Sequence, residues 1–143
     1  MNRIKVDLPE HFSFATNIAI RVTDLNYGGH VGNDSFLSLI HEARQQFLMS
    51  HGYKELEIAG AGLIMADVAI EFKKELNHGD IVKISVAATG FDKLGFDLFY
   101  KMEVMVDGNP VLAGKAKTGM MCYDYAQKKK VAVPEDVARK LVS

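Results

Sequence analysis

The residues best suited to chemistry lie in one stretch, Ile20 to Arg44, which reads IRVTDLNYGGHVGNDSFLSLIHEAR. Up to Asp34 it holds three glycines, one histidine, two asparagines and two aspartates, between an alternating apolar segment and a long apolar one. The first turn of a helix carries unpaired N–H groups and a partial positive charge, so it can polarise a carbonyl oxygen. Glycines there let a ligand approach the backbone. We therefore predict a site at this junction; the alternative is an ordinary turn with Asn33 or Asp34 as the helix N-cap.

Three carboxylates are candidates for activating water at such a site, and each has a structural alternative. Asp24 could instead bond its own turn, and Asp34 could cap the helix. Asp67 falls on the less apolar face of a predicted strand, between Met65 and Ala69, where a buried unpaired charge would be costly. The residues alone leave the choice among the three open.

Polar and backbone groups of the same stretch could bind a substrate. His30 could donate a hydrogen bond to a carbonyl, or be a structural histidine. The N–H groups from Val31 to Asp34 are candidates for an oxyanion hole, which is worth a few kcal/mol in acyl transfer. The five histidines show no metal-ligand spacing, and neither HExxH, CxxC nor GxSxG occurs, so we predict no metal site and no serine-hydrolase elbow.

Hydrophobic periodicity predicts the elements that position these residues. The pattern indicates a first strand ending near Thr23, a helix from Asp34 to Ser50 with Gly52 as C-cap, and a short helix from Glu135 to Leu141. Four long strands lie between, in the stretches LIMADVAIEFKKEL, IVKISVAATGF, LGFDLFYKMEVMV and VLAGKAKTGMMCYDY. Short turns separate them, which predicts an antiparallel meander.

Strict alternation in the first long strand predicts how its side chains divide. One face would carry Ile64, Ala66, Val68, Ile70 and Phe72, and the other Met65, Asp67, Ala69, Glu71 and Lys73. One helix on one face of a curved sheet is an α+β architecture. We expect the other face of the sheet to expose apolar side chains and to favour dimerisation.

Whole-chain properties bound the function. At 143 residues the chain is expected to form one domain, residues 1–143. The formal charge of −1 favours neither nucleic acid nor a membrane surface as partner, and the run Lys128 to Lys130 is interpreted as a solvated turn. A lone cysteine, no signal-peptide pattern and no transmembrane-length apolar run predict a cytoplasmic protein.

Three stretches resemble the hotdog-fold thioesterases, in the branch of the 4-hydroxybenzoyl-CoA thioesterase-like and acyl-CoA thioesterase-like proteins: Val22 to Arg44, GLIMADVAIEFKKELNHGD and AGKAKTGMMCYDY. The family's loop pattern is roughly D-x-D-x-x-G-H-V-N-N and ends in E-A-R. The residues matching it are Asp24, Gly29, His30, Val31, Asn33, Glu42, Ala43 and Arg44. The resemblance implies a hotdog fold, a long central helix wrapped by a curved antiparallel sheet of about five strands, in a homodimer or dimer of dimers.

Two positions depart from that pattern. The second aspartate, catalytic in the best-studied members, is Asn26 here, and the first asparagine is Gly32. An amide can orient a substrate or a water molecule but cannot take a proton or attack a thioester. The role of the missing carboxylate therefore passes to Asp24, Asp34 or Asp67; a strand carrying Asp67 could reach the partner's helix in a hotdog dimer.

The resemblance also implies a substrate, an acyl-CoA or acyl-carrier thioester, with no cofactor. The coenzyme A arm would run over Lys93 to Phe96, including Gly95, and over Lys115 to Thr118, while the loop residues and Glu42 contact the rest. The acyl group would enter between the long helix and the partner subunit. Our leading hypothesis is an acyl-CoA thioesterase. The alternative is a hotdog protein that binds an acyl thioester without hydrolysing it, and a hydratase on the same fold fits the loop less well.

Overall fold

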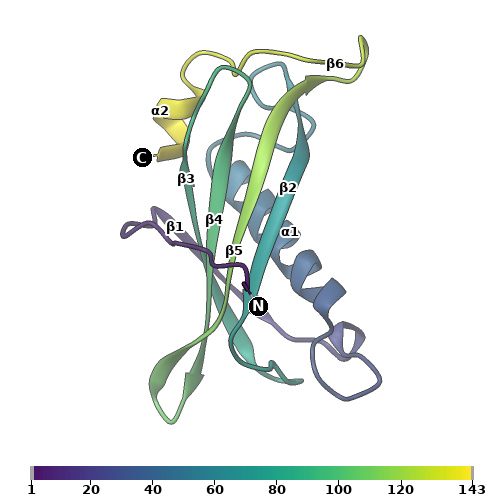
Figure 1. Cartoon of the computed structure of the whole chain (residues 1–143), viewed down its shortest axis with the longest axis vertical. Helices are drawn as coiled ribbons and strands as arrows, with labels where there is room; N and C mark the ends of the chain where they lie inside the picture. The colour runs from purple at the N-terminus through teal and green to yellow at the C-terminus, as the bar shows by residue number, and fades with distance from the viewer. Residues whose placement is uncertain (1, 143) are drawn as a thin grey trace.

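A computed structural model describes residues 2–142, in which one long helix packs against one face of a curved antiparallel sheet (Figure 1). This is the α+β hotdog arrangement that the sequence predicted. The elements in chain order are β1 (Phe14–Ala19), the 3₁₀ helix η1 (Val22–Asp24), α1 (Asn33–Ser50), β2 (Gly62–Phe72), β3 (Ile81–Thr89), β4 (Gly95–Val106), β5 (Asn109–Asp124), β6 (Lys129–Lys130) and α2 (Val137–Val142). The first strand is shorter than predicted, because η1 replaces its last residues.

Helix α1 begins one residue before the predicted start. Its buried stripe consists of Phe36, Leu39, Ile40, Ala43, Arg44, Phe47 and Leu48. The N-cap is Gly32, and it makes no side-chain capping bond, so the prediction of Asn33 or Asp34 as N-cap is wrong. At the other end the C-cap is His51, one residue before the predicted Gly52, and Gly52 follows with φ +82°, a conformation that favours glycine just past a helix end.

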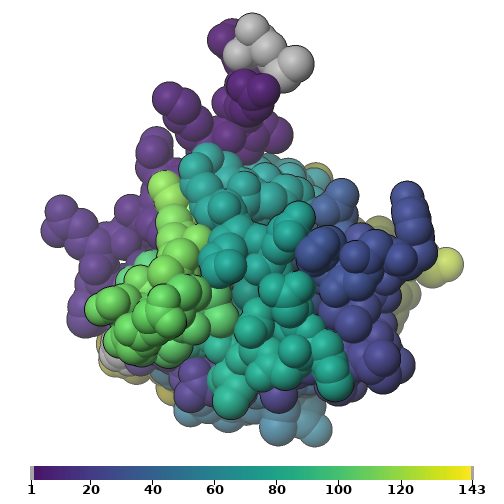
Figure 2. Space-filling model, turned by 90° about the horizontal axis from the view of Figure 1, so that it is seen from below, coloured from purple at the N-terminus to yellow at the C-terminus, as the bar shows by residue number. Residues whose placement is uncertain are grey.

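The strand order is β1-β3-β4-β5-β2, with β6 on β5. The meander prediction is correct for β3, β4 and β5 and wrong for β2, which pairs with β5 at one edge of the sheet. Residues 73–80 therefore cross the end of the sheet instead of forming a hairpin. Eight residues easily span three strand spacings, about 14 Å, so a short connection did not require neighbouring strands. Figure 2 shows this teal segment between the green β4–β5 hairpin and the dark-blue loop before α1.

A β-bulge between Met65 and Asp67 changes the faces of β2. Met65 pairs with the buried Met120, yet Val68, three residues later, pairs with the buried Thr118. Both therefore lie on the α1 side of the sheet. The predicted faces, in which Ile64 and Ala66 shared a side with Val68, are wrong because the bulge inserts one residue and reverses the alternation.

The face of the sheet turned away from α1 is largely charged, and the exposed apolar side chains predicted for it are found at one end, at Ile81 and Met105. Outward residues on β4 and β5 include Asp97, Lys101, Glu103, Lys115 and Lys117. The N-terminal segment crosses this face (Figure 1): Val6 is 3% exposed and donates its N–H to Glu71 at 2.6 Å, and the Lys101 ammonium lies 5.1 Å from the centre of the Phe12 ring. Another group of exposed apolar side chains lies along the free edge of β2 and the adjacent α1, namely Leu37, Met65, Val68 and Phe72.

Candidate functional site

The loop between η1 and α1 is folded around the Asn26 side chain. Its Oδ1 accepts the N–H groups of Gly28 at 2.8 Å and His30 at 3.4 Å. The Asn26 N–H donates to the His30 carbonyl at 2.7 Å, and Gly29 has φ +82°. Asn26 thus shapes the tight turn that precedes the helix, which an amide does without carrying a charge.

Two of the four predicted oxyanion donors are already engaged. The Val31 N–H donates to the Leu76 carbonyl at 2.9 Å, and the Gly32 N–H donates to the Asp24 carbonyl at 3.2 Å. The N–H groups of Asn33 and Asp34 belong to the first helical turn and have no acceptor within residues 2–142. The donors that remain for a ligand are therefore those of Asn33 and Asp34.

The Asp34 carboxylate stands in the space left by the missing side chain of Gly32. A Cβ added to Gly32 would lie 2.6 Å from Asp34 Oδ1 and 3.6 Å from Asn26 Cβ. The φ of Gly32 is −71°, a conformation that any residue can adopt. The glycine therefore matters here because it leaves space for the Asp34 carboxylate, and not because of its backbone flexibility. The two departures from the family pattern are thus spatially linked: position 26 lacks a carboxylate, and the small residue at position 32 admits the carboxylate of Asp34 beside it.

Asp24 has a structural position. Its side chain is 6% exposed, and its carboxylate accepts the Arg21 N–H at 2.8 Å and a guanidinium N–H of the same residue at 3.4 Å, which closes the start of η1. It lies in the wall of a 410 Å³ hollow between β1 and α1. These contacts agree with the structural alternative for Asp24, a residue that stabilises its own turn.

Asp67 lies on the charged face of the sheet, away from α1. Its carboxylate pairs with the Lys117 ammonium at 2.8 Å and accepts the Gly119 N–H at 2.9 Å. The hydrogen bond from Lys117 lowers the pKa of Asp67, which makes this carboxylate a weaker base. Within one chain the structure does not bring Asp67 to the start of α1.

Two other predicted binding residues, His30 and Glu42, lie in the loop and on α1. His30 is half-buried, and its Nδ1 lies 3.2 Å from Asn77 Oδ1 and 3.4 Å from Glu75 Oε2, so its ring is tied to the crossing segment. Glu42 is exposed on α1 and accepts a hydrogen bond from Gln46 at 2.6 Å; it does not pair with Arg44.

The residues proposed for the coenzyme A arm are not gathered at the loop. Lys93 and Gly95 lie toward the end of the sheet opposite Phe72; Gly95 is about 23 Å from Phe72 along the strands. A Cβ on Gly95 would lie 2.1 Å from the Met120 carbonyl oxygen, so this glycine permits close strand packing. Lys115 lies on the outward face, opposite Glu71 and Lys101. Within one chain these positions therefore do not meet the loop.

A small pocket with both apolar and charged walls adjoins the start of α1. It measures about 240 Å³ and is lined by Val31, Asn33, Phe36, Phe72 and residues 73–75. The rings of Phe36 and Phe72 meet edge to face with centroids 5.0 Å apart. The free N–H groups, the Asp34 carboxylate and this pocket therefore all lie at the start of α1, where Asn33, and not Asp34, lines the pocket.

A second polar cluster was not found from the sequence. Arg44, only 6% exposed, donates to Glu55 at 3.1 Å and to the Tyr100 hydroxyl at 3.3 Å, and that hydroxyl lies 2.7 Å from Thr118 Oγ1. Burial raises the pKa of Tyr100, so its hydroxyl stays neutral. The partners lie 11 to 74 positions apart, in a turn and two strands, and no local pattern joins them. Arg44 itself was visible only as part of E-A-R.

Residues 2–142 contain neither a cluster of metal-ligating side chains nor a helix suited to a membrane. No group of three or more histidine, cysteine, aspartate or glutamate side chains is placed to hold a metal ion. No helix among them is both long and apolar enough to cross a membrane.

Solved structures share this fold at low identity. The 1,4-dihydroxy-2-naphthoyl-CoA thioesterase from Synechocystis superposes with a TM-score of 0.78 at 21% identity, covering 90% of this chain and 94% of that one. A 4-hydroxybenzoyl-CoA thioesterase mutant complexed with 4-hydroxybenzoyl-CoA gives a TM-score of 0.81 at 15% identity, covering 90% and 97%. A putative thioesterase from Pseudomonas aeruginosa gives 0.79 at 19%, covering 90% and 98%.

Comparison with curated proteins gives no match. The family model described as the thioesterase-like superfamily matches residues 20–141, which include the loop, α1, β2 to β6 and most of α2. These results confirm the family expected from the loop and the E-A-R motif. The chain belongs to the thioesterase-like superfamily and has the hotdog fold.

Proposed function

We propose that this protein is an acyl-CoA thioesterase in which Asp34 acts as the general base. The observation that carries the proposal is the position of the Asp34 carboxylate in the Gly32 space, beside Asn26 and the two free N–H groups of the first helical turn. A base and oxyanion donors at one point are what thioester hydrolysis requires. Membership of the thioesterase-like superfamily supports the reaction class.

The reaction would proceed by attack of water on the thioester carbonyl. Asp34 takes a proton from the water as its oxygen bonds to the carbonyl carbon, and the N–H groups of Asn33 and Asp34 stabilise the oxyanion. The C–S bond then breaks, the coenzyme A thiolate leaves, and the proton on Asp34 passes to it. Asn26 positions the loop.

The pocket beside Phe36 and Phe72 would receive the acyl group. Its volume of about 240 Å³ suits a short chain or a single ring in one subunit. Lys73 and Lys74 in its lining supply positive charge, which Glu75 in the same lining and the pairing of Lys73 with Glu71 at 3.2 Å partly offset. A homodimer through the apolar edge of β2 would extend this pocket and could bring the coenzyme A contacts of a second subunit to it.

Thiol release from a panel of acyl-CoA esters tests the role of Asp34. We expect Asp34→Asn to lower kcat/KM by about 100-fold or more, the usual contribution of a general base. The double variant Asn26→Asp/Asp34→Asn should recover part of the loss, because the two side chains border the same space. Asp7→Asn, a change of an exposed carboxylate in the N-terminal segment, is the matched control. Full activity of Asp34→Asn would exclude Asp34 as the base.

The alternative is a protein that binds an acyl thioester and does not hydrolyse it. Asn26 favours it, since the family's usual base is absent. The solved complex of a 4-hydroxybenzoyl-CoA thioesterase mutant with 4-hydroxybenzoyl-CoA carries an aspartate-to-asparagine change. Binding of an acyl-CoA without thiol release, together with turnover gained in Asn26→Asp, would establish this alternative.

A further inference from the structure

His30 connects the loop before α1 to the segment that crosses the end of the sheet. Its Nδ1 lies 3.2 Å from Asn77 Oδ1 and 3.4 Å from Glu75 Oε2. The next residue repeats the connection through the backbone, because the Val31 N–H donates to the Leu76 carbonyl at 2.9 Å. The imidazole of His30 therefore has a fixed place relative to both segments.

Asn77 is itself anchored in a tight turn. Its N–H donates to Asp80 Oδ2 at 2.8 Å, and its carbonyl accepts the Asp80 N–H at 3.1 Å. The Asp80 carbonyl in turn accepts the N–H of Ile20 at 2.8 Å, which ties the turn to the residue after β1. These bonds use the backbone of Asn77, so its side-chain amide remains available to hold His30.

The two oxygens beside Nδ1 determine the tautomer of the His30 ring. The carboxylate oxygen of Glu75 only accepts hydrogen bonds, and so does the amide oxygen of Asn77. Nδ1 of the neutral imidazole therefore carries the proton, and Nε2 keeps a lone pair. The His30 side chain is 42% exposed, which leaves the ring accessible to a ligand. The free nitrogen is thus an acceptor, and not the donor that a carbonyl oxygen needs.

His30 and Glu75 form an edge, here called the rim, of the 240 Å³ pocket at the start of α1. Val31, which follows His30, lines that pocket, and so does Glu75, which contacts the His30 ring. Asn33 also lines it and carries one of the free N–H groups. Asn33 is three residues from His30, so their backbones lie within about 11 Å of each other. A thioester bound through its carbonyl at Asn33 therefore has its sulfur arm close to the rim.

In a pantetheine thioester, the first N–H along the arm belongs to an amide two methylene groups from the sulfur. We propose that Nε2 of His30 accepts a hydrogen bond from this amide N–H, and that Asn77 is the positioning residue that holds the ring for it. This recognition rests on the proposed function, since the thioester carbonyl must bind at the start of α1 for the arm to pass the rim. The preferred substrate class is then thioesters of pantetheine, and thioesters without the amide N–H bind less well.

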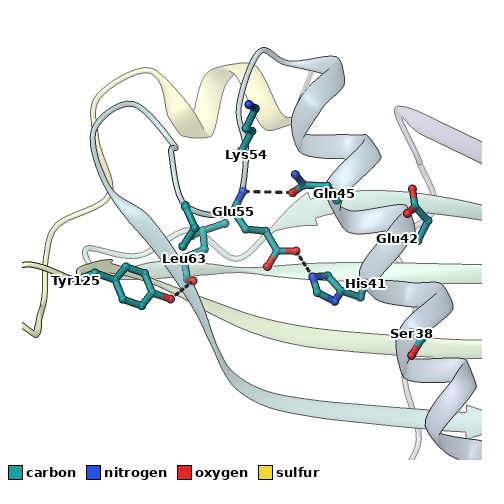
Figure 3. A pocket seen from close by; sticks show the side chains of 9 residues that line it. Ser38, His41, Glu42, Gln45, Lys54, Glu55, Leu63 and Tyr125 are labelled. Carbon is teal, nitrogen blue, oxygen red and sulfur yellow. Dashed lines mark hydrogen bonds and ion pairs between the residues drawn. The ribbon is translucent and has the colours of Figure 1, made fainter.

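A second histidine–glutamate pair provides a matched control. In the hollow of about 540 Å³ beside the middle of α1, Nε2 of His41 lies 2.9 Å from Glu55 Oε1 (Figure 3). This hollow shares no lining residue with the pocket at the start of α1. His41→Ala therefore removes an exposed imidazole with a carboxylate partner and leaves the rim intact.

Two thioesters that differ by one methyl group test the recognition in the full-length protein. S-butyryl-N-acetylcysteamine carries the amide N–H, and its N-methyl analogue lacks it. The ratio of their kcat/KM values measures the preference for the N–H. We expect His30→Ala to lower this ratio about 5-fold, the usual worth of one hydrogen bond, while His41→Ala leaves it unchanged. Equal ratios in wild type and His30→Ala, or an equal fall in His41→Ala, would overturn the proposal.

Variants of Asn77 separate positioning from folding. Asn77→Ala should lower the same ratio because the ring of His30 is then free to turn, while the backbone bonds to Asp80 remain. Asn77→Asp keeps an acceptor for Nδ1 and should keep the ratio. His78→Ala changes an exposed residue of the same turn and is the control. A folded Asn77→Ala protein with the wild-type ratio would exclude Asn77 as the positioning residue.

A ligand that cannot be hydrolysed keeps this test apart from that of the proposed thioesterase. S-acetonyl-N-acetylcysteamine has a methylene group between sulfur and carbonyl, and its dissociation constant relative to the N-methyl analogue gives the preference without turnover. A wild type that prefers the N–H ligand and releases no thiol refutes only the hydrolysis. A wild type that hydrolyses butyryl-CoA and shows no preference dependent on His30 refutes only the recognition. Butyryl-CoA and butyryl-acyl carrier protein, assayed side by side, then identify the source of the arm.

Discussion

At the scale of single residues, Gly32 decides which carboxylate stands near Asn26. A side chain at this position would displace Asp34, whose Oδ1 lies 2.6 Å from the point where a Cβ would stand. The sequence showed two independent departures from a family pattern, Asn26 and Gly32. Their connection became visible only when the loop was folded, because the three residues meet through a turn whose geometry depends on the Asn26 side chain.

Gly32→Ala is expected to reduce activity without destabilising the protein. The backbone at Gly32 has φ −71°, which alanine adopts freely, so no backbone strain arises. The new methyl group would move the Asp34 carboxylate, and a displacement of about 1 Å can cost about 100-fold in rate. Acyl-CoA turnover and the thermal midpoint of unfolding, compared with wild type, measure the two effects. Unchanged turnover would mean that the carboxylate does not act from this position.

At the scale of elements, the bulge in β2 sets what the helix and the sheet present to each other. It turns Met65 toward α1 and leaves Asp67 on the opposite face, where the carboxylate accepts the N–H of Gly119. A Cβ on Gly119 would lie 2.5 Å from Asp67 Oδ1, so the glycine and the aspartate fit together at the bulge. We interpret Asp67 as a structural residue of the bulge.

Asp67→Ala is therefore expected to lower stability and spare the chemistry. The loss should be about 1 kcal/mol, because the change removes an exposed ion pair with Lys117 and one hydrogen bond from Gly119. Lys117 lowers the pKa of Asp67 in the folded protein. The stabilisation is then present above the unfolded value of about 3.9 and is lost as pH falls through the folded value.

Unfolding midpoints at pH 7 and pH 3, with kcat at pH 7, test this interpretation. The difference between wild type and Asp67→Ala should shrink in acid, and Asp7→Asn should show no such difference. A collapse of kcat in a folded Asp67→Ala protein would instead favour Asp67 as a general base.

At the scale of the whole molecule, the open edge of β2 is the surface suited to self-association. One side of β2 pairs with β5, and the other carries no strand within residues 2–142. An unpaired edge offers free N–H and C=O groups, and here it is flanked by exposed Met65, Val68 and Phe72. The opposite face of the sheet is largely charged, and its exposed apolar side chains, Ile81 and Met105, lie at one end in a hollow of about 740 Å³, away from the β2 edge.

Val68→Lys is expected to convert a dimer into monomers. Val68 is 39% exposed, so the lysine fits the single chain but places a charge in an edge-to-edge interface. Ile81→Lys is the control, since Ile81 is 59% exposed on β3, three strands away. Sedimentation equilibrium measures the mass of each protein. A monomeric wild type would refute the dimer prediction.

The sequence by itself determined which segments are helix and strand, and it identified the family. These predictions used local patterns: the apolar spacing of α1, the alternation in the long strands and the E-A-R motif. Each pattern involves only residues of the same helix or the same strand. The site loop was predictable for the same reason. Gly28, Gly29, Asn26 and the helix start are neighbours along the chain.

Tertiary structure alone decided which of these residues meet. A short connection does not specify the strand partner, so β2 could lie beside β5 and not β3. A single bulge reverses every later side chain, which separated Asp67 from the helix. Hydrogen bonds between distant positions, such as Arg44 with Glu55 and Tyr100, depend on how the helix rests on the sheet. Local periodicity predicts the conformation of a segment. The partners of its side chains depend on packing across the whole chain and cannot be predicted from that periodicity.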